Sequence, residues 1–387
     1  MTSYPIYFDY NATTPCDPRV VDTMLPFFNR DFGNAASRSH AYGWVAEEAV
    51  DIAREQVAAL IGAEAGEIVF TSGATEAVNL AIRGAYEMYG VKGKHIITCA
   101  VEHKAVLDTC HYLESIGGEI TVLPVNRDGR LDVDALEAAI RPDTVLISIM
   151  YANNETGVIM PVKAIGTIAK RHNVLFFSDA TQAVGKLPVD VLEDEIDIMS
   201  FSAHKMYGPK GVGALYVRRK NPRVKLTPLQ YGGGHEKGMR SGTLNVPGIV
   251  GFGKAAEIAS IEMRDESVRL RGLRDQLLKG LLAIEGTALN GDPDFLLPHT
   301  CNVSFGGVES QVLISHLNRN LAVSSGSACT SASIEPSYVL RALGIGDELA
   351  SSSIRFSLGR FTTHEEVVRA LVFIKEAVGK LRVSSEQ

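Results

Sequence analysis

Residues 67–82 read EIVFTSGATEAVNLAI, and this stretch contains the unit from which the fold is built: an apolar strand, a turn and a helix. Residues 67–70 predict a short buried strand, Thr71-Ser72-Gly73 the turn, and residues 74–82 the helix. Similar apolar, β-branched or aromatic runs, typical of strands covered on both faces, lie at residues 95–99, 144–150, 174–178, 197–202 and 213–217. Strands that alternate with helices predict an α/β domain with a mostly parallel sheet.

Two longer helices are predicted outside this alternating region. Residues 45–61 carry an apolar stripe formed by Val45, Ala49, Ile52, Ala53, Val57, Leu60 and Ile61. Residues 262–282 predict a charged helix with an inner stripe of Val268, Leu270, Leu273, Leu277 and Leu281. Because short strands and helices follow it, we expect a large α/β domain over 15–260 and a smaller α+β domain from 1–14 and 261–387.

Composition indicates a globular protein and argues against several classes of partner. The 387 residues are 45% hydrophobic and 21% charged, and 38 basic against 45 acidic residues give a net charge of −7. That balance argues against nucleic acid or an anionic membrane as the main partner. No apolar run reaches the roughly 18 residues that span a bilayer, and no targeting peptide is recognised. We therefore expect a cytoplasmic protein.

The cysteines predict neither a disulfide framework nor a metal site. They are few and scattered, at Cys16, Cys99, Cys110, Cys301 and Cys329. A framework of disulfides is typical of short secreted chains, and no cysteine or histidine pair has the spacing of a zinc site. We expect a reducing compartment and no structural metal.

Polar clusters follow four of the predicted strands, at residues 71–76, 153–155, 179–182 and 202–205. In open α/β sheets, ligands bind beyond the carboxyl ends of the strands. The four clusters therefore predict one shared site.

The first cluster predicts an anion site. It places Gly73, Ala74 and Thr75 where a helix begins, and free backbone N–H groups and the helix dipole attract an anion there. The segment matches neither the nucleoside-triphosphate nor the dinucleotide motif, so a single phosphate fits better. A helix cap by Ser72 or Thr75 explains the same residues equally well.

Asp179 and Lys205 extend this interpretation to a cofactor. A carboxylate at the end of the apolar run VLFFSDA is costly to bury unless a cation or a strong donor meets it. A lysine in an apolar cleft can form a Schiff base. Together with the anion site, Asp179 as partner of a pyridinium nitrogen and Lys205 as a Schiff-base amine indicate pyridoxal phosphate. Taken singly, Asp179 also fits a structural hydrogen-bond network, and Lys205 a solvated surface group.

Three further residues are candidates for the chemistry. His103 precedes a helix, where its imidazole could stack on the cofactor ring and move protons, or only neighbour the helix cap. Arg355 offers a guanidinium fork that could bind a carboxylate. Its alternative role is a structural ion pair, and the nearby Arg360 could fill that role instead. Cys329 lies among small polar residues at 324–333, which predicts a mobile loop and makes its thiol the candidate nucleophile.

With these residues in hand, the chain resembles the cysteine desulfurases of the NifS/IscS family, and most closely their IscS branch. These are class-V aminotransferases within the fold-type I pyridoxal-phosphate enzymes. The resemblance covers nearly the full length and rests on stretches in the same order: FDYNATTP, TSGATEAVNLAIRG, EHKAVLDTC, ANNETGV, DATQAVGK, SFSAHKMYGPKGVGALYVRR, GGGHEKGMRSGT and SSGSACTSASIEPSYVLRALG.

The resemblance implies a role for each matching residue. Lys205 holds the cofactor covalently, Asp179 pairs with its ring nitrogen, Gln182 donates to its phenolic oxygen, and His103 stacks over the ring. The phosphate is held by Ala74, Thr75, Ser202 and His204, joined by Thr243 of the other subunit of a homodimer. Asn154 contacts both cofactor and substrate, and Arg355 binds the substrate carboxylate.

The resemblance also implies the reaction and its partners. L-cysteine loses its sulfur to Cys329, which becomes a persulfide, and L-alanine is released. The persulfide then reaches an acceptor, such as a scaffold protein for iron–sulfur cluster assembly, and Cys329 is also a candidate transient cluster ligand. Two departures from the family pattern are Ala35, where a proline is common, and an end at KLRVSSEQ, where IscS-type chains often continue into a scaffold-docking extension.

Other functions remain compatible with these residues. A selenocysteine lyase or a cysteine-sulfinate desulfinase of the same fold would keep the cofactor residues and depend less on Cys329. An aminotransferase would need a keto-acid acceptor. A non-catalytic binding protein would be favoured by a degraded site, but Lys205, Asp179, His103 and Cys329 are all present.

Overall fold

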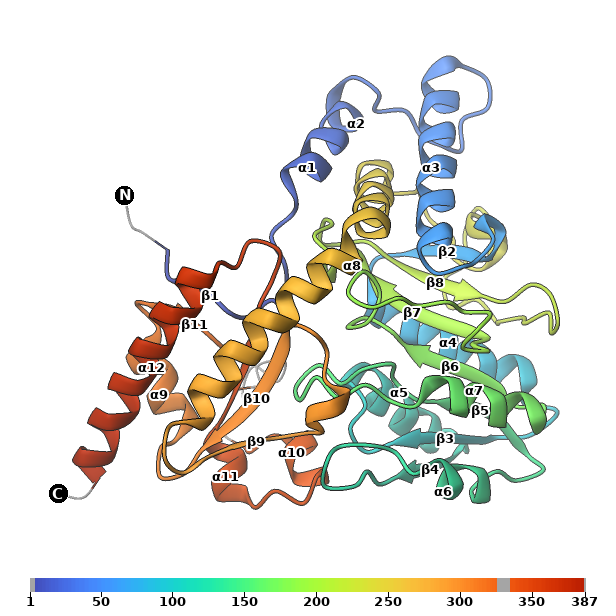
Figure 1. Cartoon of the computed structure of the whole chain (residues 1–387). Coiled ribbons are helices and arrows are strands. Elements are labelled where there is room, and N and C mark those ends of the chain that lie inside the picture. The colour runs from blue at the N-terminus through green and yellow to red at the C-terminus, as the bar shows by residue number, and fades with distance from the viewer. Residues whose placement is uncertain (1–3, 326–334, 386–387) are drawn as a thin grey trace.

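The computed structural model describes residues 4–325 and 335–385, and its largest element is a seven-stranded sheet (Figure 1). The strands lie in the order β2 (Ile68–Thr71), β8 (Gly213–Val217), β7 (Ile198–Ser202), β6 (Leu175–Asp179), β5 (Thr144–Ser148), β3 (His95–Cys99) and β4 (Glu119–Leu123). Only β8 runs antiparallel to its neighbours β2 and β7; the other neighbouring strands are parallel. The predicted α/β fold with a mostly parallel sheet is confirmed.

Helices cover both faces of this sheet, which explains why its strands are apolar on both sides. Phe176 packs in the core shared with α3 (Ala41–Leu60), α7 (Val162–Arg171) and the first part of α8 (Val246–Leu282). Its neighbour Phe177 points to the opposite face, in the core shared with α4 (Ala74–Tyr89) and α5 (Lys104–Ser115). Successive residues of a strand face opposite sides, so both faces need apolar residues.

The edge strand β4 does not appear among the strands that the sequence predicts. Its residues EITVL include exposed positions, and only Leu123 is buried. A strand at the edge of a sheet is covered less than a central one, so the continuous apolar run that marks the central strands is missing. A short helix, α6 (Val133–Ala138), follows it.

A second hydrophobic core lies beside the sheet, in the part of the chain that the sequence predicts to form the smaller domain. An antiparallel sheet has the strand order β12 (Ser353–Ser357), β10 (Thr300–Phe305), β9 (Thr287–Leu289), and β1 (Ile6–Tyr7) pairs in parallel with β11 (Leu321–Ala322). The core between them and the helices includes Phe305, Phe356 and Leu277. The helices that contribute to it are the second part of α8, α9 (Ser310–Leu317) and α12 (His364–Ser385). Two short helices, α10 (Tyr338–Ala342) and α11 (Asp347–Ser351), lie between α9 and α12 in the sequence.

The long helix α8 crosses from one core to the other without interruption (Figure 1). Asn245 begins it, accepting a hydrogen bond from the Gly248 amide, and its 37 residues correspond to a length of roughly 55 Å. Residues 246–259 contribute to the large core and residues 270–281 to the small one. The predicted domain boundary at residue 260 falls inside this helix and stays a prediction.

The predicted inner stripe of this helix is wrong at one position. Leu270, Leu273, Leu277 and Leu281 are buried, but Val268 is 75% exposed. Val268 precedes Leu270 by two residues, which places it about 200° around the helix from that leucine. Within residues 4–325 and 335–385, no helix combines the length and the apolar character needed to cross a membrane.

Candidate active site

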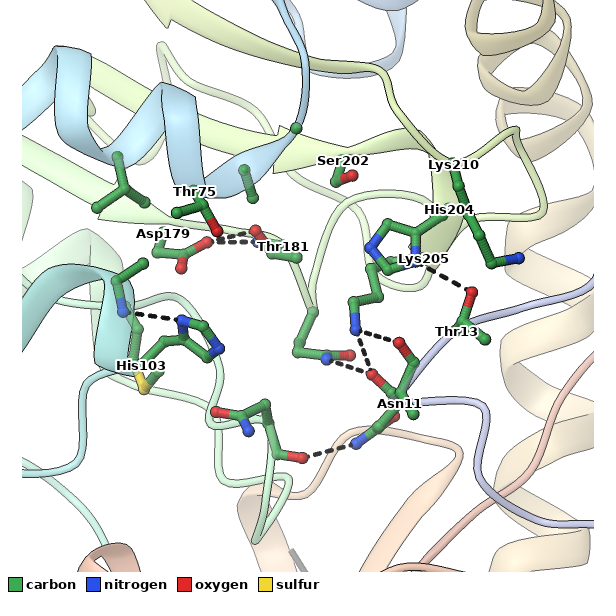
Figure 2. A pocket seen from close by; sticks show the side chains of 18 of the residues that line it. Asn11, Thr13, Thr75, His103, Asp179, Thr181, Ser202, His204, Lys205 and Lys210 are labelled. Atoms are coloured by element: carbon green, nitrogen blue, oxygen red, sulfur yellow. Dashed lines mark hydrogen bonds between the residues drawn. The ribbon is translucent and has the colours of Figure 1, made fainter. Parts of the chain in front are cut away.

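The polar clusters that follow the strands meet around one cavity of about 620 Å³ (Figure 2). The cavity lies beyond the carboxyl ends of the parallel strands, where α/β folds bind ligands. The predicted site residues that line it are Ala74, Thr75, His103, Asn154, Asp179, Gln182, Ser202, His204, Lys205 and Arg355. The prediction that these segments converge is confirmed, while the role of each residue stays a prediction.

Lys205 follows β7 in a short 3-10 turn, and its side chain reaches the N-terminal segment of the chain. Its Nζ donates hydrogen bonds to the backbone carbonyls of Asn11 at 2.5 Å and Ala12 at 2.7 Å. The ring of His204 lies 3.1 Å from the Thr13 hydroxyl, through Nδ1. Burial and the nearby lysines lower the pKa of His204 to about 4. At neutral pH His204 is therefore an uncharged hydrogen-bonding group.

Asp179 is the last residue of β6 and is 7% exposed. Its Oδ1 accepts hydrogen bonds from the amide of Thr181 at 3.0 Å, from the hydroxyl of Thr181 at 2.5 Å and from the hydroxyl of Ser200 at 3.3 Å. These neutral donors hold the carboxylate in place, and a cationic nitrogen in the cavity would be a stronger partner than any of them.

Helix α4 begins at the cavity without a side-chain cap. Its N-cap is Gly73, and no side chain of residues 4–325 or 335–385 bonds to the first amides, so neither Ser72 nor Thr75 caps the helix. The acidic residue of the first turn, Glu76, is turned to Arg240, with Oε1 2.8 Å from Nε. Burial raises the pKa of Glu76, but Arg240 and Ser72 outweigh it and the pKa is lowered overall. The uncapped amides favour the interpretation of this turn as an anion site.

His103 is itself the N-cap of α5 and also lines the cavity. Its Nδ1 accepts a hydrogen bond from the amide of Ala105 at 3.1 Å. An accepting Nδ1 carries no proton, so the proton of the neutral ring lies on Nε2. Figure 2 shows the ring beside the open space that Asp179 and Lys205 also border.

Arg355 enters the cavity from β12 of the smaller domain. Its side chain is 3% exposed, and it donates to the Asn154 carbonyl at 3.0 Å and to the Asp9 carboxylate at 2.7 Å. Arg355 Nε and the side-chain oxygen of Asn154 are buried, and neither has a hydrogen-bond partner among the described residues. Two unsatisfied groups on one wall mark a place where a polar ligand would be stabilised.

Arg360 differs from Arg355 in its position. Its guanidinium lies 2.7 Å from Asp17 and 2.8 Å from Glu266, away from the cavity lining. Both arginines form an ion pair, Arg355 with Asp9 and Arg360 with Asp17 and Glu266, so the alternative of a structural ion pair agrees with the structure for each.

Two predicted site residues are not among the described residues that line this cavity. Thr243 is exposed and does not line it. Cys329 lies outside the described residues. Of the other cysteines, Cys99, Cys110 and Cys301 are buried, as expected for inert core thiols.

The structure adds Asn11, a buried residue that the sequence did not single out as part of the site. Its Oδ1 lies 2.9 Å from His299 Nε2 and accepts from the Thr300 hydroxyl at 3.1 Å, while its Nδ2 donates to the Asn154 carbonyl at 3.1 Å. The signal was the polar run NATT, which begins three residues after the apolar IYF. Further lining residues of this kind are Thr13, Thr181 and Lys210.

Glu102, the neighbour of His103, is a second addition. It is fully buried, and its Oε1 accepts the Met150 amide at 2.5 Å. Burial raises its pKa to about 8, with a further contribution from the charge of Asp179. Glu102 is therefore a neutral acid at pH 7. No group of His, Cys, Asp and Glu side chains suited to a metal ion occurs in the part of the chain that the structure describes.

Comparison with known proteins places this geometry in a family. The model of the class-V aminotransferases matches residues 6–370. Cysteine desulfurase IscS of Anaeromyxobacter dehalogenans is 59% identical over 382 residues, which cover 98% of this chain and 94% of that protein.

Solved structures agree with the sequence comparison. A NifS-like protein superposes with a TM-score of 0.89 at 39% identity, covering 97% of this chain and all of the other. A protein named SspA, solved in complex with cysteine, has a TM-score of 0.81 at 38% identity, with coverage of 92% of this chain and 100% of that one.

Proposed function

This chain belongs to the class-V aminotransferase family, and we propose that it is a pyridoxal-phosphate-dependent cysteine desulfurase. One observation carries the proposal: a lysine amine, a buried carboxylate and an uncapped helix N-terminus border one cavity, with an arginine on its wall. The substrate is L-cysteine, and the products are L-alanine and a persulfide on Cys329.

The cavity residues fit the cofactor. Lys205 would hold it covalently through Nζ, Asp179 would pair with its ring nitrogen and Gln182 with its phenolic oxygen. The start of α4 would hold the phosphate through Ala74 and Thr75, together with Ser202 and His204. Pyridoxal phosphate would supply an electron sink that weakens bonds to the substrate Cα.

Arg355 would orient the substrate. Its buried guanidinium already uses two nitrogens, while Nε has no partner among the described residues. A substrate carboxylate would pair with this fork, with Asn154 beside it. A fixed carboxylate holds Cα over the reactive part of the cavity.

His103 and Lys205 are placed to move protons. Lys205 Nζ would take the proton from Cα of the bound substrate. His103 would exchange a proton at Nε2, since Nδ1 is occupied by the Ala105 amide. The Cys329 thiol must lose its proton, because the thiolate is the competent nucleophile.

The sulfur transfer balances without an external oxidant. The C–S bond of L-cysteine breaks, an S–S bond to Cys329 forms, and the carbon skeleton leaves as L-alanine after gaining a proton at Cβ. One thiol and one cysteine thus become one persulfide and one alanine.

We propose that the active unit is a homodimer. Thr243 is exposed and lies outside the cavity of its own chain, which suits a residue that completes the partner's phosphate site. The apolar surface of α1 (Pro18–Met24), α2 (Pro26–Asn29) and α3 provides a candidate interface. Its exposed side chains are Val21, Leu25, Phe28, Phe32, Tyr42, Trp44, Val45 and Ile52. Val45 and Ile52 lie on α3 and belong to the apolar stripe predicted for residues 45–61. A partner subunit that covers them would explain why these exposed residues are apolar.

The proposal extends to a protein that accepts the sulfur, such as a scaffold for iron–sulfur cluster assembly, and to a cytoplasmic location. The motif around Cys329, SSGSACTSAS, supports this, because it matches the family in which such a cysteine passes sulfur to a protein. Cys329 as a transient cluster ligand is part of the same proposal.

The test is a product assay on the cofactor-loaded protein with L-cysteine and a thiol reductant. We expect equal amounts of alanine and sulfide from the wild type and loss of both in Cys329→Ala. Cys16→Ala, a partly exposed cysteine outside the cavity lining, is the matched control and should retain both. Alanine formation by Cys329→Ala at the wild-type rate would contradict the persulfide route. Turnover of selenocysteine or cysteine sulfinate, but not of cysteine, would instead favour one of the related lyases.

A further inference from the structure

Lys186 lies four residues after Gln182 and does not itself line the cavity. The segment after β6 turns helically, with the Val184 amide donating to the Ala180 carbonyl at 3.0 Å. Lys186 Nζ donates to Gln182 Oε1 at 2.7 Å.

The turn that carries Lys186 is packed against the residue after Lys205. Gly185 has a φ of +76°, and a Cβ there would lie 2.7 Å from the Cβ of Met206. Only glycine combines this backbone conformation with such a close approach. The position of Lys186 is therefore set by the same packing that sets Lys205.

Gln182 is held from two sides by groups of opposite type. Its Nε2 donates to the Asn11 carbonyl at 3.1 Å, and its Oε1 accepts from Lys186. A carbonyl only accepts hydrogen bonds and an ammonium only donates them, so both neighbours select the same orientation of the amide. The second N–H of Nε2 stays available to the cavity that Gln182 lines.

We propose that Lys186 is a positioning residue that keeps the amide nitrogen of Gln182, rather than its oxygen, turned toward the phenolic oxygen of pyridoxal phosphate. This rests on the proposed function, because the phenolic oxygen belongs to the cofactor. A reversed amide would place an oxygen against that oxygen and lose the hydrogen bond. Without Lys186, the Asn11 carbonyl alone would select the orientation.

The surroundings of Lys186 are consistent with this role in either protonation state. Burial lowers its pKa, Lys205 and Arg355 lower it further, and Glu266 opposes them. A neutral amine can donate to Oε1 but can also accept through its lone pair, so in that state Lys186 stabilises the orientation that the Asn11 carbonyl selects. The lysine is also costly to bury, so replacing it with methionine should not destabilise the fold.

The test follows the absorption spectrum of the bound cofactor and its pH titration in the holoenzyme, together with kcat and KM. We expect Lys186→Met to shift both spectrum and titration in the same direction as Gln182→Met, and to lower kcat about tenfold, the size of one lost hydrogen bond. Lys186→Arg, which keeps a donor to Gln182 Oε1, should have the same spectrum as the wild type. The double variant should match Gln182→Met alone, because Lys186 acts through Gln182.

Lys254→Met is the matched control, since Lys254 pairs with Glu257 on α8 and does not line the cavity. A Lys186→Met spectrum identical to the wild type, or a shift that adds to that of Gln182→Met, would overturn the role of Lys186. A wild type that binds no pyridoxal phosphate would overturn the proposed function instead. Thermal unfolding of each variant separates both outcomes from simple misfolding.

Discussion

The sheet has a cavity at each end of its strands, and charged side chains line both. At the amino ends, a cavity of about 440 Å³ is bordered by Lys170, Glu195, Asp197 and Arg218. These charges pair with one another, Lys170 with Glu195 at 2.5 Å and Arg218 with Asp197 at 3.0 Å. At the carboxyl ends, Lys205 donates hydrogen bonds to two backbone carbonyls. Asp179 accepts hydrogen bonds from two hydroxyls and one amide.

This difference separates charges that hold the fold from charges that meet a ligand. An ion pair between two side chains satisfies both of them, and a ligand must compete with it. A cation and an anion held apart by neutral groups can each exchange those groups for a stronger, charged partner. Two other charged residues at the carboxyl ends, Arg355 and Glu76, are paired with Asp9 and Arg240, so the contrast rests on Lys205 and Asp179. On this ground we propose the cavity at the carboxyl ends as the site, and the three predictions below test the contrast.

The largest effect is expected from Lys205. Lys205→Ala should lower alanine formation by roughly 10³-fold or more, since one group both holds the cofactor and moves the proton. Lys170→Ala, at the amino-end cavity, should stay within about twofold of the wild type, because an exposed ion pair contributes little. Initial rates with L-cysteine measure both. Comparable losses in the two variants would remove the distinction between the cavities.

Arg355 should show the next largest effect, concentrated in KM. Arg355→Lys keeps the charge but loses the fork, and KM for L-cysteine should rise by about tenfold to a hundredfold with a smaller change in kcat. The control is Arg218→Lys, which should leave KM unchanged and lower the free energy of unfolding by about 1–3 kcal/mol. An unchanged KM in Arg355→Lys would show that the substrate carboxylate binds elsewhere.

The smallest effect concerns Glu102, which has no cationic partner recorded beside it. Burial raises its pKa to about 8, so the folded protein keeps a proton that the unfolded chain loses above about pH 4.5. This group therefore makes the free energy of unfolding fall as pH rises from about 4.5 to 8. Glu102→Gln, which mimics the neutral acid, should remove that fall, a difference on the order of 2 kcal/mol between pH 5 and pH 8.

Urea unfolding of the holoenzyme at the two pH values measures this difference. Glu376→Gln, an exposed glutamate of α12, is the control and should leave the pH dependence as in the wild type. Parallel pH curves for the wild type and Glu102→Gln would mean that Glu102 is ionised in the folded protein.

Local patterns predicted the elements that carry the site. The central strands are covered on both faces, so their apolar runs were visible, and the polar residues that end them were visible for the same reason. The edge strand β4 was not predicted, and Val268 was wrongly predicted to be buried. Local hydrophobicity does not say which surface of a strand or helix is covered by another element. The exposed Val45 and Ile52 show this too, since their apolar character has no explanation within one chain.

The sequence by itself determined that a lysine, a carboxylate and a helix start would meet at the carboxyl ends of one sheet, because strand direction carries successive strand ends to the same edge. Only the tertiary structure decided which residues, distant in the sequence, form hydrogen bonds to these site residues. Lys205 and Gln182 both bond to the carbonyl of Asn11, more than 170 residues away in each case. No local periodicity encodes such a contact, because it arises when the two domains pack and bury backbone groups that must then find partners.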